Sequence, residues 1–210
     1  TSKTFYVCTS GKIIWPYIDA ASISFDEGYL YSASHDVKCI ARELIGEESV
    51  DVVVGLQKRD WIFSKGVSIK MDLPEVKLYK SGDIDGSKMD GLRAIHISDL
   101  NNYGTSTTLA SQMVEKDGGI LTHAVYYVDR GREEARISLE RLGVKHDAVI
   151  TLNESTWKYM LHDLKGQNKR PVFSPKRIDK IERILENEEI WARESLLSRN
   201  GLTRLKEYIE

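Results

Sequence analysis

Short apolar runs bounded by polar or turn residues recur along the chain and predict the strands of a sheet. They cover residues 50–56, 92–100, 120–130 and 146–152, and each is rich in β-branched or aromatic side chains. The runs are apolar on both faces, which is typical of parallel strands covered by helices on both sides. We therefore predict a mostly parallel sheet.

Helix-like segments lie between the strands, over residues 32–45, 105–119 and 132–144. In the last of them Ala135 and Leu139 share one face, and the segment ends near Gly143. Alternating strands and helices predict a doubly wound α/β fold. In such folds ligands bind beyond the carboxyl ends of the strands.

The pattern changes near residue 157. A polar, basic segment is followed by Ser174 and Pro175, which predict the start of a helix. The apolar stripe of that helix comprises Ile178, Ile181 and Leu185. We predict an α/β domain over residues 1–156 and a C-terminal helical extension over residues 157–210, either packed on the domain or reaching to a second subunit.

Composition narrows the setting. Thirty basic and thirty-two acidic residues leave a net charge of −2, so the chain has no overall field to attract nucleic acid or an anionic membrane. Cys8 and Cys39 are too few for a disulfide framework. No apolar run approaches the roughly twenty residues of a membrane span. We expect a cytoplasmic protein without a nucleic-acid or membrane partner. The chain begins without methionine, and we expect a few residues to precede it.

One turn concentrates candidate chemistry. Asp99 closes a predicted buried strand, and Thr105, Ser106 and Thr107 open the next helix after Gly104. Free N–H groups and the helix dipole favour an anion at such a position. The alternative is that Thr105 or Ser106 simply caps the helix.

The five histidines have no spacing of a metal site. They are His35, His96, His123, His146 and His162. We predict that His96 and His123, inside apolar strands, are buried and hydrogen-bonded, and we predict no protein-built metal site.

Four segments, in order, resemble one protein family. "GSKMDGLRAIHISDLNNYGTSTTLASQMVEKDGG" is similar to the phosphoribosyl-pyrophosphate (PRPP) loop region of type I phosphoribosyltransferases, particularly orotate phosphoribosyltransferase. "FYVCTSGKIIWPYIDA", "VDVVVGL" and "YYVDRGREEA" are similar to its N-terminal stretch, its strand before the pyrophosphate loop and its Asp-Arg strand end. The resemblance covers roughly residues 5–155. It implies the type I phosphoribosyltransferase fold and a homodimer.

The resemblance implies roles for the turn. Asp99 matches the second acid of the PRPP motif, which holds the ribose hydroxyls, and Ser98 stands at the place of the first acid. The implied PRPP-binding set is Ser98, Asp99, Asn102, Tyr103, Gly104, Thr105, Ser106 and Thr107. Asn102 and Tyr103 replace small threonines of the family, and Tyr103 is large enough to narrow or fill the phosphate cradle.

The resemblance also implies a base site. Arg130, after Asp129, matches the arginine that contacts orotate. An exposed arginine at a strand end is the alternative. Tyr17 and Ile18 lie where the family often has two aromatic residues against the base.

The pyrophosphate segments depart further from the family. Where small residues and glycines usually wrap the pyrophosphate, Lys58 and Arg59 stand beside Asp60 and Trp61. The two cations can bind phosphate oxygens. The alternative is that Asp60 and Trp61 close this pocket. The flexible catalytic loop falls over residues 74–86 and offers Lys77 and Lys80, for which lysines on a solvated loop are the alternative.

The implied reaction transfers ribose 5-phosphate from PRPP to a base, orotate first, with Mg²⁺ arriving on PRPP. The implied catalytic residues are Lys77, Lys80 and Asp99. Two alternatives stay open: a non-catalytic homologue that binds PRPP or a nucleotide as a signal, and a transferase for another base.

Overall fold

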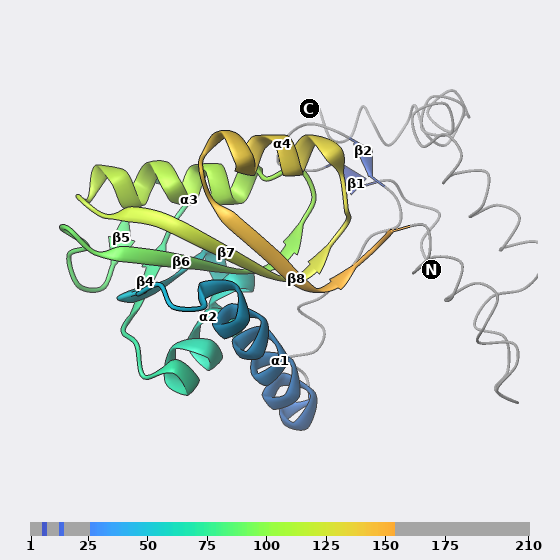
Figure 1. Cartoon of the computed structure of the whole chain (residues 1–210), viewed down its shortest axis with the longest axis horizontal. Helices are drawn as coiled ribbons and strands as arrows, with labels where there is room; N and C mark the ends of the chain where they lie inside the picture. Colours follow the sequence, from blue (N-terminus) through green and yellow to red (C-terminus); the bar gives the residue numbers. More distant parts are fainter. Residues whose placement is uncertain (1–5, 8–12, 15–25, 154–210) are drawn as a thin grey trace, which may run out of the picture. The chain divides into compact units, whose positions relative to one another are not determined.

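The computed structural model describes residues 6–7, 13–14 and 26–153 (Figure 1). Strands β1 (Tyr6–Val7) and β2 (Ile13–Ile14) pair antiparallel and belong to one compact unit, and residues 26–153 belong to another. The predicted extension over residues 157–210 lies outside the described residues. The boundary at residue 156 therefore stays a prediction.

The unit that holds residues 26–153 is built on a six-stranded sheet in the order β5-β4-β3-β6-β7-β8. The strands are β3 (Val52–Leu56), β4 (Glu75–Leu78), β5 (Ile84–Asp85), β6 (Arg93–Asn101), β7 (Ile120–Asp129) and β8 (Lys145–Thr151). All neighbours pair parallel except β5, which pairs antiparallel with β4. The predicted mostly parallel sheet is confirmed.

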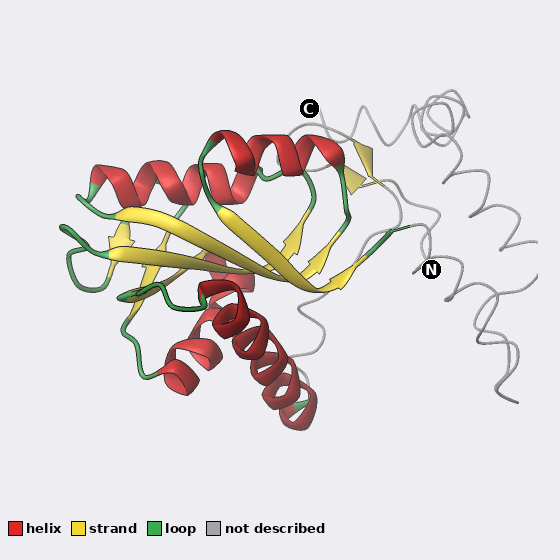
Figure 2. Cartoon of the chain, viewed as in Figure 1, coloured by secondary structure: helices red, strands yellow, loops and turns green. Residues whose placement is uncertain are grey.

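Helices cover both faces of this sheet. They are α1 (Glu27–Ile45), α2 (Gln57–Met71), α3 (Thr105–Lys116) and α4 (Glu133–Arg141). Figure 2 shows α1 and α2 on one face, with α3 and α4 on the other. The helices predicted over 32–45, 105–119 and 132–144 are confirmed as α1, α3 and α4.

The core has two layers because successive strand residues point to opposite faces. Val52 and Val54 of β3 pack with the residues beneath α3 and α4, whereas Val53 packs with those beneath α1 and α2. All three valines are fully buried. The apolar runs therefore filled both faces of the sheet, as their composition predicted.

Two segments differ from the sequence expectation. The segment that begins at Gln57, predicted as a pyrophosphate loop, is the first turn of α2, which follows β3 directly. Its buried face includes Ser64 and Ser68, so it carries no clear apolar stripe. A methyl group on Gly66 would lie 2.3 Å from the Ser34 hydroxyl, so small residues bring α2 against α1.

The second difference concerns residues 74–86, predicted as a flexible loop. They form β4, a turn and β5. Val76 and Leu78 are buried, and Glu75 and Lys77 on the opposite face are partly exposed. Two buried residues at alternate positions make a strand signal too short to recognise among flanking lysines and glycines.

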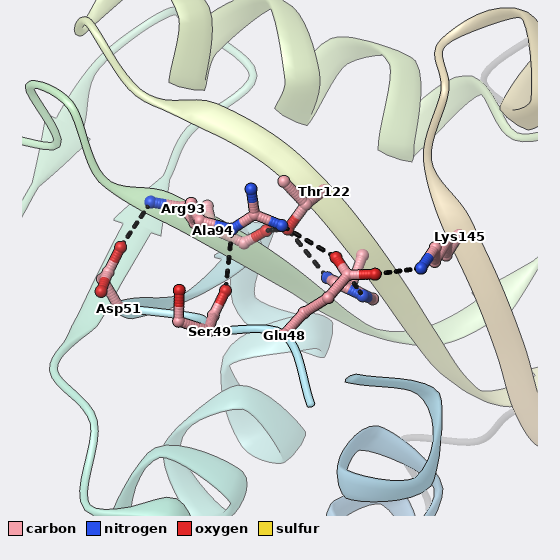
Figure 3. A network of polar contacts seen from close by, with 8 residues as sticks. Glu48, Ser49, Asp51, Arg93, Ala94, Thr122 and Lys145 are labelled. Carbon is pink, nitrogen blue, oxygen red and sulfur yellow. Dashed lines mark hydrogen bonds and ion pairs between the residues drawn. The ribbon is translucent and has the colours of Figure 1, made fainter. Parts of the chain in front are cut away.

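The amino ends of the central strands are joined by an ion-pair network (Figure 3). The Arg93 guanidinium donates to Glu48 Oε2 at 2.8 Å and, through Nε, to the Ser49 carbonyl at 2.8 Å. The Arg93 backbone N–H donates to Asp51 Oδ2 at 2.8 Å, and Lys145 Nζ donates to Glu48 Oε1. This network ties β6 and β8 to the segment between α1 and β3.

The two strand histidines are fully buried, as predicted. His96 contacts Asp60 and Thr107, and His123 Nδ1 lies 2.8 Å from the Thr122 hydroxyl. His123 Nε2 lies 3.7 Å from Glu48 Oε2. No helix within residues 26–153 is long and apolar enough to cross a membrane.

Candidate active site

The candidate site lies at the carboxyl edge of the sheet, where β3, β6 and β7 end. Asn101 of β6 pairs with Asp129 of β7, and β3 ends at Leu56. The turn after β6 leads into α3, and the segment after β7 leads into α4. The fold thereby gathers three of the sequence-predicted segments at one edge.

The turn from Asn101 to Gly104 is held by its own side chains. Asn101 Oδ1 accepts the Gly104 N–H at 3.0 Å, and the Thr108 hydroxyl donates to the Gly104 carbonyl at 3.0 Å. Gly104 has φ of 74°, a left-handed conformation that favours glycine. A methyl group there would also lie 3.4 Å from the Ala135 carbonyl. The turn is therefore compact and fixed.

The N-terminus of α3 has the properties of an anion site. Its N-cap, Gly104, provides no side-chain cap, and no acidic residue lies in the first turn. First-turn N–H groups have no acceptor within the helix and carry the positive end of its dipole. Thr105 is exposed and Ser106 half-buried. Because no side chain caps this end, the alternative of a simple Thr105 or Ser106 cap is not what the structure has.

Ser98 and Asp99 lie near the end of β6 and are both buried, with exposed fractions of 2% and 6%. The Asp99 backbone N–H donates to Asp60 Oδ1 at 3.2 Å. Asp60 is in the first turn of α2 and is 3% exposed. Asp60, from the segment predicted to bind pyrophosphate, thus holds the strand that carries Asp99, the acid predicted to bind PRPP.

Asp60 is a residue whose role the sequence reasoning missed. Its Oδ2 accepts the Leu56 N–H at 3.0 Å and faces His96 Nε2 at 3.3 Å. Asp60 stands four residues after the N-cap Leu56, one position later than the acid of a capping box, so the sequence carries no standard capping signal for it. Asp60 therefore closes the junction of β3 and α2 instead of standing open to a ligand.

The contacts of Asp60 continue into a buried chain. His96 Nδ1 lies 3.1 Å from the Thr107 hydroxyl, which lies 2.8 Å from the Tyr126 hydroxyl. Because Asp60 Oδ2 is already an acceptor, we assign the histidine proton to Nε2, so that Thr107 donates to Nδ1 and accepts from Tyr126. Burial raises the pKa of Tyr126 above its usual value, and the bond to Thr107 offsets only part of that rise. The Thr107 hydroxyl thus points into the core.

The predicted pyrophosphate and catalytic cations lie on three elements. Lys58 and Arg59 are exposed in the first turn of α2, Lys77 is on β4, and Lys80 is in the turn after it. Lys77 Nζ lies 5.7 Å from the Trp61 ring centroid. The structure brings Lys77 to Trp61 across the β3–β4 end of the sheet.

Trp61 itself covers the end of β3. Its indole Nε1 donates to the Gly55 carbonyl at 2.9 Å, and its ring meets the Tyr79 ring edge-on with centroids 4.8 Å apart. A methyl group on Gly55 would lie 2.5 Å from the Ser64 hydroxyl. The backbone here is closely packed by α2.

Arg130 follows β7 directly and is partly buried. Its backbone N–H donates to the Asn101 carbonyl at 3.1 Å, which places the base-site candidate beside the phosphate turn. Tyr103 of that turn lies under Arg132, whose guanidinium carbon is 4.7 Å from the ring centroid. Arg132, two residues after Arg130, was not among the predicted residues.

The remaining predicted residues, Tyr17 and Ile18, lie outside the described residues. Asn102 is partly buried in the turn. Within the described part of the chain, no group of three or more His, Cys, Asp or Glu side chains could hold a metal ion. The arrangement thus brings a helix end without a side-chain cap, a buried acid and an arginine to one sheet edge.

Comparison with known proteins agrees with the fold. No model of a known protein family matches the chain. An orotate phosphoribosyltransferase of Sulfolobus acidocaldarius is 23% identical over 183 residues, which cover 84% of this chain and 90% of the relative. One from Sulfurisphaera tokodaii is 26% identical over 155 residues, 71% of this chain and 77% of the relative. The crystal structure of orotate phosphoribosyltransferase from Aeropyrum pernix superposes with a TM-score of 0.62 at 24% identity, over 77% of this chain and 91% of that one. The fold is that of type I phosphoribosyltransferases.

Proposed function

We propose that this chain, a divergent relative of the orotate phosphoribosyltransferases, transfers ribose 5-phosphate from PRPP to a nitrogenous base, most simply orotate. The observation that carries the proposal is the uncapped N-terminus of α3, which follows the buried Asp99 at the carboxyl edge of the sheet. Anionic substrates bind at that edge in doubly wound folds.

The phosphate and ribose are bound by the turn and the helix that follows it. The 5′-phosphate accepts hydrogen bonds from first-turn N–H groups and from the Thr105 and Ser106 hydroxyls. Thr107 contributes through its backbone alone, since its hydroxyl bonds inside the core. Asp99 accepts from the ribose hydroxyls, and its strand is steadied by Asp60. Ser98, in place of an acid, gives the site one carboxylate fewer.

Arg130 is the proposed base-recognition residue. A guanidinium pairs with a carboxylate in a planar, two-bond geometry, which suits orotate better than an uncharged base. Tyr17 and Ile18 lie outside the described residues, and their role at the base stays a prediction from the sequence. A transferase for a different base is the alternative that shares every other feature of the site.

In the reaction, a base nitrogen forms a bond to the anomeric carbon of PRPP while the bond from that carbon to the pyrophosphate oxygen breaks. The pyrophosphate leaves with the electron pair of that bond, and the proton of the base nitrogen passes to the departing pyrophosphate or to water. Positive charge develops on the ribose, and negative charge on the leaving group, so positioning and charge neutralisation supply the catalysis. Lys77 and Lys80, with Lys58 and Arg59, are the proposed cations for the pyrophosphate.

Mg²⁺ is proposed to arrive bound to the diphosphate of PRPP, whose oxygens are the hard ligands that this ion prefers. Asp99 is a suitable carboxylate beside such an ion, because oxygen ligands of this kind bind it directly or through water. When bound, the ion neutralises charge on the leaving group. The side chains of the site orient the ribose and the base around it.

A second candidate function has its own support. The helix α2 begins directly after β3, and Trp61 bonds to the Gly55 carbonyl, so no loop stands at this strand end to wrap a diphosphate. This favours a non-catalytic protein that binds a phosphorylated ribose as a signal.

We also propose a homodimer and a cytoplasmic location. Sedimentation tests the first, and cell fractionation tests the second.

The deciding experiment measures pyrophosphate release from PRPP and Mg²⁺ with orotate, beside calorimetric titration of PRPP alone. Orotate-dependent release supports the transferase, and PRPP binding without release supports the signal-binding alternative. Uracil and purine bases in parallel reactions identify a different base. Arg130→Ala should abolish the preference for a carboxylated base and leave PRPP binding intact, whereas Arg141→Ala, on exposed α4, should change neither. Unchanged orotate turnover in Arg130→Ala would contradict the base-site assignment.

A further inference from the structure

We propose that Asn101 is a positioning residue that holds the phosphate-binding turn and the base-facing Arg130 in register, so that the two substrates meet in the reactive geometry. This inference rests on the proposed transferase function and adds a residue that the family resemblance does not assign. The side chain of Asn101 is buried, with an exposed fraction of 3%.

On one side, Asn101 fixes the turn. Its amide oxygen accepts the Gly104 N–H at 3.0 Å, directly before the first turn of α3. Gly104 is the N-cap of that helix, so this bond sets where the anion-binding N–H groups begin. Movement of the Asn101 side chain therefore displaces the phosphate cradle.

On the other side, Asn101 fixes the end of β7. Its side-chain amide nitrogen donates to Asp129 Oδ2 at 3.0 Å, and its backbone carbonyl accepts the Arg130 N–H at 3.1 Å. Asp129 Oδ1 in turn accepts the Gly131 N–H at 2.7 Å. Arg130 thus lies between Asp129, whose side chain Asn101 holds, and Gly131, whose N–H the same carboxylate accepts.

An amide is the side chain that meets both requirements. The pair needs an acceptor toward Gly104 and a donor toward Asp129, and a carboxylate has no donor while an aliphatic group has neither. Asn101 and Asp129 are opposite each other in the β6–β7 register. Because of this alignment, the amide and the carboxylate can be swapped between positions 101 and 129 while the two side chains stay opposite each other.

The test begins with Asn101→Asp. This variant keeps the acceptor for Gly104 but places two carboxylates against each other, and at about pH 8 we expect kcat/KM to fall roughly tenfold to a hundredfold. At about pH 5 one carboxyl group takes up a proton and restores the missing donor, so part of the loss should be recovered. Asp129→Asn loses one bond in either amide orientation and should show a smaller loss without this pH dependence.

The double variant N101D/D129N exchanges donor and acceptor and restores all three side-chain bonds. We expect it to recover wild-type kcat/KM to within about threefold and to remove the pH dependence. Gln112→Glu, on the exposed face of α3, makes the same charge change and should leave all these quantities unaltered.

Two readouts separate positioning from stability. The first is the coupling of the substrates, measured as the change in PRPP affinity caused by orotate, which should weaken in N101D and return in the double variant. The second is amide hydrogen exchange at Gly104 and Gly131, which should accelerate together in N101D, because the two carboxylates repel each other away from both N–H groups, and return to wild-type rates in the double variant. The exchange measurement needs no ligand.

The outcomes distinguish this inference from the proposed function. If wild-type protein neither binds PRPP nor releases pyrophosphate, the proposed function fails, while the exchange rates still report whether Asn101 holds both segments. Unchanged coupling and exchange in N101D would overturn the inference. A double variant that restores neither would overturn it as well.

Discussion

The two edges of the central sheet are built in opposite ways. At the amino edge, Arg93, Glu48 and Lys145 form ion pairs whose side chains are 37% to 57% exposed. At the carboxyl edge, Asp60 and Asn101 are almost fully buried; Asp60 accepts the Asp99 N–H of β6, and Asn101 accepts the Gly104 N–H of the turn that follows. Exposed ion pairs are screened by water and tolerate change. Buried polar contacts fix positions, because an unpaired partner is costly.

The difference indicates where function is concentrated. At the amino edge, exposed ion pairs that tolerate substitution join the strands. At the carboxyl edge, buried polar side chains hold a helix end and two strand ends in place.

The largest effect is expected for Asp60→Ala. It leaves the Leu56 and Asp99 N–H groups and His96 without their acceptor, so the free energy of unfolding should fall by about 3 kcal/mol. PRPP affinity should fall with it, because Asp99 loses its support. Urea denaturation and calorimetry measure the two quantities. Glu48→Ala, at the other edge, is the control and should leave PRPP affinity unchanged; equal losses of affinity in both variants would remove the distinction between the edges.

The next effect is expected for Gly104→Ala. A side chain at φ of 74° is strained, and its methyl group lies 3.4 Å from a backbone carbonyl, so we expect a loss of about 2 kcal/mol in the free energy of unfolding. Gly143→Ala is a matched control, since its φ of 68° carries the same strain with nothing within 4 Å. Only Gly104→Ala should also weaken PRPP binding in calorimetry. A loss of PRPP affinity in Gly143→Ala would show that strain alone is responsible.

Thr107→Val should show whether the Thr107 hydroxyl stabilises the core or binds the phosphate. Removing it leaves His96 Nδ1 and the Tyr126 hydroxyl without a partner, so the free energy of unfolding should fall by about 1.5 kcal/mol. PRPP affinity should change little, and Thr107→Ser should restore stability. The opposite result, an unchanged unfolding midpoint with a large loss of PRPP affinity, would assign the hydroxyl to the phosphate.

The smallest effect concerns pH at the amino edge. Burial lowers the pKa of His123, although the neighbouring Glu48 acts to raise it. The unfolded chain therefore binds the proton first as pH falls through about 6.5, and the free energy of unfolding should decrease between about pH 7 and about pH 5. The lowered pKa of Glu48, due first to the bond from Lys145, acts in a separate window below about pH 4.5.

Denaturation at several pH values measures the His123 effect. His123→Gln should flatten the pH dependence in that window, whereas His35→Gln, on the exposed surface of α1, should not. An identical pH dependence in His123→Gln and wild type would exclude His123 as its source.

Much of the fold followed from local sequence signals. The apolar runs predicted β3, β6, β7 and β8 within a few residues, and the segments between them predicted α1, α3 and α4. The helix α2 was missed because polar residues such as Ser64 and Ser68 share its buried face with apolar ones, and the short strands β4 and β5 were missed because they bury too few residues to set a period. For α2, close packing of small residues against α1 decides the conformation.

The sequence by itself determined that Asp99, Gly104 and the hydroxyls after it stand between a buried strand and a helix, and that Arg130 stands at another strand end. Only the tertiary structure decided that Asp60 supports the Asp99 strand, that Thr107 turns inward, and that Asn101 bonds to Asp129. Asn101 and Asp129 are 28 residues apart in the sequence, and Asp60 and Asp99 are 39 apart. Both pairs meet because β6 lies between β3 and β7 in the sheet. Local periodicity encodes which face of an element is buried, whereas the order of strands in space decides which strand ends become neighbours.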